Sequence, residues 1–194
     1  MSVTKFTNNG VIDSAKYDSF KANNQPVMGV SYESIATATV TSGGTTSSIV
    51  FSSIPQTFTH LQLRGFCNTS TANLVILRFN SNVSNYSFHY TYGGGAGTPT
   101  SGGGGGASGG YIQDTTSTSA TYTSSVTDIL DYTSTNKYKT FRTLAGYDIN
   151  GSGAIRLWSG SQYSDATAIS TITLLLDTAA TVNQYSSFAL YGIK

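Results

Sequence analysis

Apolar and polar residues alternate along short segments of the chain from about residue 35 onward. Clear examples are Ile35–Thr41, Tyr86–Tyr92 and Ala154–Ser159, each followed by glycine or serine. A period of two places successive side chains on opposite faces of a β-strand, and the residues between the segments favour turns. Roughly nine or ten such segments follow one another at short intervals, as in a two-sheet antiparallel sandwich. The sequence therefore predicts an all-β fold and, most specifically, a jelly roll.

Some segments allow more detailed predictions. Ile35–Thr41 and Ser47–Phe51 flank the turn-like residues Ser42–Thr45, which predicts a β-hairpin. Asn73–Asn80 is apolar at odd and even positions alike, and so is Leu174–Leu176. We expect such strands to be covered on both sides, by the opposing sheet and by a loop or a neighbouring subunit.

Residues 1–33 differ from the rest of the chain and are predicted to form an N-terminal arm, extended or partly helical. Spacing within Asp13–Lys21 allows one or two helical turns, and Pro26 ends them. Two roles are open for the arm. It packs at the edge of its own domain or of a domain-swapped copy, or it anchors the chain on another protein. Residues 34–194 are predicted to be the β-sandwich domain. The candidate anchor residues are Lys16, Tyr17, Phe20 and Lys21.

The segment Gly93–Gly110 holds eleven of the 21 glycines and is predicted to be a loop. A phosphate-binding loop would be followed by a Lys-Ser/Thr pair and a helix. Here the segment leads into Tyr111–Ile112 and another strand-like stretch, so a nucleotide site is not expected. Because a glycine run loses much conformational entropy on ordering, we expect it to pack against its own domain or a neighbouring chain.

Composition and charge exclude several classes of protein. Charged residues make up 10% of the chain, the net charge is +1, and the six lysines and four arginines are scattered. Nucleic-acid binding is not expected, because it needs clustered positive charge. No segment approaches the ~18 apolar residues of a membrane-spanning helix, and the N-terminus lacks the apolar region of a signal peptide. Cys67 is the single cysteine, so we expect folding without disulfides, as in the cytosol.

Candidate catalytic groups are few, and we predict no enzymatic activity and no cofactor. His60 and His89 each fit the solvent face of a strand, and Asp128 and Asp131 are spaced so as to point to opposite faces. A Ser-His-Asp set stays open as an alternative, although no nucleophile-elbow context is present.

The segment that begins at Asp148 allows two interpretations. Asp148, Asn150 and Ser152 match the first half of a calcium-binding loop, but position twelve would be Ser159 instead of a bidentate glutamate. Asn150 followed by glycine is also the commonest signal for a two-residue hairpin turn. The turn is favoured, and the three residues are kept as a weak calcium candidate.

Aromatic residues supply the candidate binding surface. Tyrosine and tryptophan form rigid platforms that stack on sugar rings and on proteins, and Trp158 with Tyr163 is the candidate platform. The alternating aromatic row Tyr86–Tyr92 is expected to belong to the sandwich core instead.

Three parts of the chain together resemble a family of short virion proteins from tailed bacteriophages. They are Phe51–Gly65, then Asp128–Thr140 with Asp148–Gly153, and the C-terminal Gln184–Lys194. The resemblance covers about Ser34–Lys194. The glycine-rich segment is longer than is usual in the family, and the arm is of no familiar type.

The resemblance implies a β-sandwich appendage of the virion, such as a tail fibre, head fibre or decoration subunit, and it transfers no catalytic residues. It also implies folding in the host cytoplasm, a final place on the virion surface, and contacts with other virion proteins. A homo-oligomer is expected, and a trimer is favoured. The predicted function is a projecting fibre or appendage subunit anchored by its arm. The alternatives are a capsid decoration (cement) protein and a carbohydrate-binding module that contacts host-surface glycans.

Overall fold

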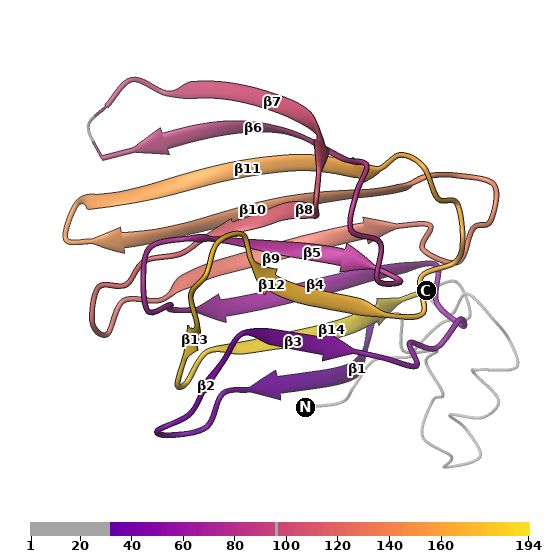
Figure 1. Ribbon diagram of the computed structural model, residues 1–194, viewed down its shortest axis with the longest axis horizontal. Coiled ribbons are helices and arrows are strands. Elements are labelled where there is room, and N and C mark those ends of the chain that lie inside the picture. Colours follow the sequence, from indigo (N-terminus) through magenta and orange to yellow (C-terminus); the bar gives the residue numbers. More distant parts are fainter. Residues whose placement is uncertain (1–31, 96) are drawn as a thin grey trace, which may run out of the picture. The chain divides into compact units, whose positions relative to one another are not determined.

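The computed structural model describes residues 32–95 and 97–194 (Figure 1). The partly helical arm and its candidate anchor residues Lys16, Tyr17, Phe20 and Lys21 lie outside this part of the chain. Glu33–Lys194 form one compact unit. The described residues contain strands and no helix, so the all-β prediction is confirmed for them. None of them forms a helix long and apolar enough to span a membrane.

Two antiparallel sheets of unequal width make up the fold. The large sheet has eight strands, in the order β1 (Tyr32–Thr39), β14 (Ser187–Ile193), β4 (His60–Cys67), β9 (Thr123–Leu130), β10 (Lys139–Ile149), β11 (Ser152–Gln162), β6 (Tyr86–Gly94) and β7 (Thr100–Ala107). The small sheet has four strands, in the order β3 (Ser48–Phe51), β12 (Ile172–Leu176), β5 (Leu74–Phe79) and β8 (Gly110–Asp114). The short strands β2 (Thr45–Thr46) and β13 (Val182–Asn183) pair with each other.

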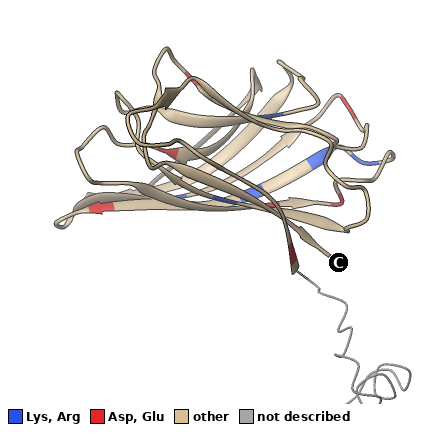
Figure 2. Cartoon of the chain, turned by 90° about the horizontal axis from the view of Figure 1, so that it is seen from below, with Lys and Arg blue, Asp and Glu red and all other residues tan. Residues whose placement is uncertain are grey.

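One hydrophobic core lies between the two sheets. Alternate residues of β4 point inward, and Leu61 and Leu63 are almost completely buried. Leu77 of β5 and Ile112 of β8 enter the same cluster from the small sheet. Lysine, arginine, aspartate and glutamate are scattered over both layers (Figure 2). Burial of one face of each sheet is therefore the main force that holds the layers together.

The predicted hairpin between Ile35–Thr41 and Ser47–Phe51 is wrong. The turn itself forms, since Gly43 has a φ of +73° and Gly44 N–H donates to the Thr41 carbonyl at 3.0 Å. After it, however, the chain crosses from one sheet to the other, because β1 pairs with β14 and β3 pairs with β12. Burial of Phe51 between the sheets outweighs local pairing.

The strand predicted to be covered on both sides is β5. Its core face holds Val75, Leu77 and Phe79, yet Ile76 on the other face is only 2% exposed. A Cβ added to Gly109 would lie 3.0 Å from the Ile76 side chain. The chain just before β8 thus covers this face, and no neighbouring subunit is needed to bury Ile76.

The glycine-rich segment is a strand for much of its length, so its prediction as a loop is wrong. Residues 100–107 form β7, the last strand of the large sheet, which pairs with β6. Tyr90 stands opposite Gly102, and a Cβ there would lie 2.7 Å from the Tyr90 hydroxyl. Phe88 covers Gly104 in the same way. The aromatic rings of β6 thus lie over a strand that has no side chains, an arrangement known to compensate for glycine in sheets.

Two further glycines make room for a core ring. Phe141 of β10 is fully buried, and a Cβ at Gly110 or at Gly160 would overlap the end of its ring. Gly110 belongs to the small sheet and Gly160 to β11 in the large sheet. The ring is thus confined from both sides and cannot move away from an added methyl group.

We expect Gly110→Ala to lower the free energy of unfolding by about 1–3 kcal/mol, the usual cost of overpacking a core. Gly105→Ala is the matched control, because its nearest neighbour would be the Tyr163 hydroxyl at 3.9 Å, and it should change stability by less than about 0.5 kcal/mol. Urea unfolding of both variants measures the difference. Equal stability of the two would contradict the packing described for Phe141.

Candidate interaction surface

Apolar side chains gather on the outer face of the large sheet. Leu144 of β10 stands opposite Val126 of β9 on one side and opposite Leu157 of β11 on the other. The exposed fractions are 40% for Val126, 49% for Leu144, 55% for Leu157 and 56% for Ile155. We name these four residues the outer apolar face. Cross-strand neighbours on one face of a sheet lie about 5 Å apart, so the first three form a continuous row.

Burial on the inner side explains why this face is outward. Thr143, Ala145 and Trp158 alternate with the apolar residues along β10 and β11, and all three are buried. Both sides of these strands are thus apolar or weakly polar. An antiparallel sheet with one face in water normally carries polar residues there, and a contiguous exposed apolar patch marks an interaction site.

Charged residues border the outer apolar face. Asp128 stands opposite Arg142 and opposite Gln62. Gln62 Nε2 donates to Asp128 Oδ1 at 2.9 Å, and Arg64 Nε donates to Gln62 Oε1 at 3.0 Å. Asp128 is therefore part of a polar row beside the apolar one. Asp131 lies in the turn beyond β9, so the two carboxylates do not form a pair.

Trp158 does not occupy the position that a stacking platform requires. Its side chain points inward and is only 3% exposed. Its ring packs against Phe88, Tyr90 and Tyr111 at centroid distances between 5.0 and 5.9 Å. Tyr163 is 39% exposed, and its hydroxyl accepts the N–H of Gly106. The predicted platform is therefore corrected: Trp158 is a core residue, because its strand buries the side that carries the ring.

The aromatic row of β6 faces the interior, as expected. Tyr86 is fully buried, and its hydroxyl accepts the N–H of Phe79 at 2.7 Å. Phe88, Tyr90 and Tyr92 are only half-buried. Figure 1 shows the reason, since β6 and β7 lie beyond β8, the last strand of the small sheet.

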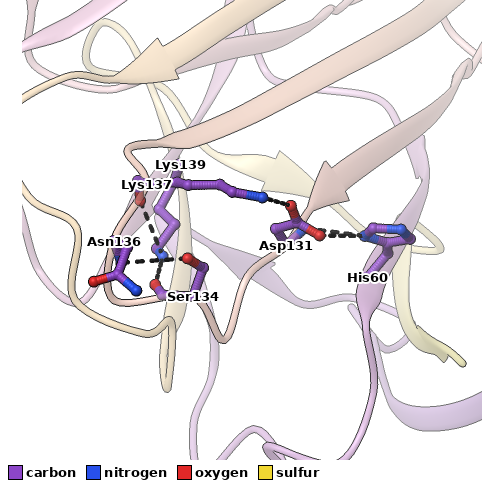
Figure 3. A network of polar contacts seen from close by, with 6 residues as sticks. All are labelled: His60, Asp131, Ser134, Asn136, Lys137 and Lys139. Atoms are coloured by element: carbon purple, nitrogen blue, oxygen red, sulfur yellow. Dashed lines mark hydrogen bonds and ion pairs between the residues drawn. The ribbon is translucent and has the colours of Figure 1, made fainter.

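A polar cluster surrounds the connection between β9 and β10 (Figure 3). The N–H of Asp131 donates to His60 Nδ1 at 2.9 Å, and Lys137 Nζ lies 2.7 Å from Asp131 Oδ2. This lysine lowers the pKa of Asp131 through its hydrogen bond and its charge. Because His60 Nδ1 accepts a backbone hydrogen bond, the proton of the neutral ring is on Nε2.

Lys139 is a buried member of the same cluster, with a residue exposure of 2%. Its ammonium group donates to the carbonyls of Ser134 and Lys137. Burial lowers the pKa of Lys139. The contacts of Lys139 and His60 all serve to hold the residues between the two strands, so the geometry assigns the cluster a structural role.

The two histidines lie far apart. His60 is on β4 and His89 is on β6, with β9, β10 and β11 between them. Four strand spacings of ~4.8 Å place them about 19 Å apart along the sheet. They cannot act on one substrate atom.

The segment that begins at Asp148 forms the turn between β10 and β11. Asn150 and Gly151 have φ values of 51° and 85°, and Ile149 pairs with Ser152. Asp148 Oδ1 accepts the N–H of Gly151 at 3.0 Å. The hairpin prediction is confirmed. Within residues 32–95 and 97–194 no group of three or more His, Cys, Asp or Glu side chains could hold a metal ion.

Comparison of the chain with models of protein families, with curated proteins and with solved structures gives no match.

Calcium distinguishes the two interpretations of the β10–β11 turn. The hydrogen bond from the Gly151 N–H to Asp148 Oδ1 holds the turn from within the chain, so we expect millimolar calcium or a chelator to leave the melting temperature unchanged. Gly151→Ala should lower the free energy of unfolding by about 1–2 kcal/mol, because alanine is strained in the left-handed region of φ. Thermal melts follow both effects. A rise in melting temperature with calcium that Asp148→Ala removes would restore the cation site.

Proposed function

We propose that the chain is a structural subunit that assembles with copies of itself through the outer apolar face. The observation that carries this proposal is the continuous cross-strand row Val126, Leu144 and Leu157, whose side chains are 40–55% exposed on the outer side of the large sheet. The likeness of Ser34–Lys194 to tailed-phage virion proteins supports a specific role, that of a fibre or appendage subunit on the virion surface.

The dimensions of the sheet suit an interface between two copies. Eight strands with a spacing of ~4.8 Å span about 38 Å, and eight residues of strand span about 27 Å. Their product, about 1,000 Å², is the area of the whole outer side of the sheet, so an interface of the roughly 800 Å² per partner that a standard stable complex buries would extend beyond the apolar row onto its polar border.

Charge also favours a second copy as the partner. The net charge of +1 gives little repulsion between copies. Asp128 and Arg142 lie side by side at the border of the apolar row, so the surface carries both signs. A surface with both signs can complement itself, as an interface between identical subunits requires. A self-complementary face pairs two copies, so a trimer, which the resemblance favours, would need a second and different contact surface on each subunit.

We also propose that the core of the fold is a jelly roll. Four pairs of strands nest within one another along the chain: β1 with β14, β3 with β12, β4 with β9 and β5 with β8. A single long hairpin folded over on itself gives this order, as in jelly rolls. The hairpins β6–β7 and β10–β11 are then insertions that widen the large sheet. Jelly rolls are frequent in viral capsids, which supports the virion role by analogy of fold alone.

The alternatives differ in where the subunit attaches. A decoration protein would use the same outer apolar face to contact its neighbours on the capsid. The arm remains the predicted anchor. Its predicted end at residue 33 falls inside β1, which begins at Tyr32, so an arm-less chain should start at Tyr32. A carbohydrate-binding module would need a sugar site elsewhere on the domain.

We expect the wild-type protein to sediment as an oligomer and Leu144→Lys/Leu157→Lys to sediment as a monomer, because two lysines in the row would have to be desolvated on association. Val50→Lys is the matched control, since Val50 is 55% exposed on β3 of the small sheet. Sedimentation velocity gives the masses, and circular dichroism checks the folds. A monomeric wild type, or an unchanged oligomer in the double variant, would contradict the proposal.

A further inference from the structure

A polar crevice lies on the opposite side of β11 from the outer apolar face. It opens near the β10–β11 turn, between the large sheet and the ends of small-sheet strands. Its volume of about 450 Å³ is within the ~300–1,000 Å³ usual for small-molecule sites. The lining residues that carry chemistry are Asn73, Tyr92, Asp114, Tyr147, Arg156 and Asp177.

An ion pair forms the floor of this crevice. Arg156 Nε lies 2.9 Å from Asp114 Oδ2, and the two side chains are 17% and 19% exposed. Burial raises the pKa of Asp114, while the Arg156 guanidinium opposes the rise. An arginine has five N–H donors, more than one carboxylate can accept. The pair therefore presents both donors and acceptors to a ligand.

Aromatic rings hold the guanidinium in place. Arg156 Cζ lies 4.5 Å from the ring centre of Tyr92 and 4.8 Å from that of Trp158. Such cation–π contacts fix the plane of the group. Tyr92 and Tyr147 are both half-buried and border the crevice. An arginine held over the rings of Tyr92 and Trp158 is a site formed before any ligand arrives, which lowers the entropy cost of binding.

The charges select the class of ligand. Arg156 contributes +1, while Asp114 and the exposed Asp177 contribute −2, so the crevice carries a net charge of −1. Anions such as phosphates or acidic sugars are repelled. Groups that donate and accept hydrogen bonds, set beside tyrosine rings, suit a molecule with several hydroxyl groups and an apolar ring face.

We infer that this crevice binds a neutral sugar. The hydroxyls of one sugar unit bond to Asp114 and Arg156, and its ring packs against Tyr92 or Tyr147. The crevice and the outer apolar face lie on opposite sides of β11, so sugar binding and self-association are separate properties. A failure of one leaves the other standing.

Trp158 provides a built-in reporter for the test. It is the single tryptophan of the chain, and its ring contacts Arg156. Methyl glucoside, methyl galactoside, methyl mannoside and N-acetylglucosamine are titrated as probes while tryptophan emission is followed. At least one of the four should change the emission saturably, with a dissociation constant of about 1 mM, as expected for so small a ligand. Glucuronic acid should bind at least about tenfold more weakly, because of the negative charge of the crevice.

Two variants locate the site. Asp114→Asn removes the charge and one acceptor, and Tyr147→Ala removes a ring, so each should weaken binding about tenfold. Tyr138→Ala is the matched control, since Tyr138 is 57% exposed and does not line the crevice, and it should bind as the wild type does. Thermal melts confirm that each variant is folded. If Asp114→Asn fails to fold, Tyr147→Ala decides alone.

Three results would overturn the inference. They are no saturable response to any of the four neutral sugars, equal affinity in Tyr147→Ala and the wild type, or a preference for glucuronic acid.

Discussion

The unequal width of the two sheets is the constraint on which the other features depend. Eight strands face four, so the small sheet covers the inner side of only part of the large one. Because β8, the last strand of the small sheet, packs mainly against β10 and β11, the strands that lie beyond it are β6 and β7 (Figure 1). Apolar surface left beyond β8 must be covered by side chains of the large sheet itself or be left in contact with water.

The glycines of β7 and the aromatic residues of β6 meet this need together. Tyr90 and Phe88 lie over Gly102 and Gly104, so the rings of β6 occupy the space that side chains on β7 would otherwise fill. Strand β11 carries residues of both candidate surfaces. Leu157 and Arg156 are adjacent in β11 yet point to opposite faces, one toward the outer apolar face and the other into the crevice.

Local patterns predicted the strands well and their partners poorly. The period-two segments and the Asn150–Gly151 turn follow from short-range chemistry, and the structure has strands and a hairpin there. The pairing of β1 with β14, and of β3 with β12, depends on burial across the whole core, which no local signal carries. β7 was predicted as a loop because glycine has no preference for strands, and its order comes from the rings on β6.

The candidate sites, like the strand partners, depend on long-range packing that local sequence patterns do not carry. The prediction that Trp158 is a surface platform rests on the rigid, amphipathic ring of tryptophan, whereas its strand buries that side. The one available signal for the outer apolar face was that Ile155 and Leu157 alternate with Trp158, which makes both faces of the strand apolar. Which of the two faces is outward depends on the position of the small sheet. The pairing of Asp114 with Arg156 joins residues 42 positions apart, and only the fold brings them together.

Cross-linking at the outer face tests the central claim most directly. Cys67 is fully buried, and burial raises its pKa to about 12, so a cysteine introduced at Leu157 would be the reactive thiol. We predict that a short bismaleimide converts Leu157→Cys into covalent dimers at low protein concentration, whereas Val50→Cys stays monomeric. Equal yields from the two variants, or no dimers from Leu157→Cys, would contradict an interface on this face of the sheet.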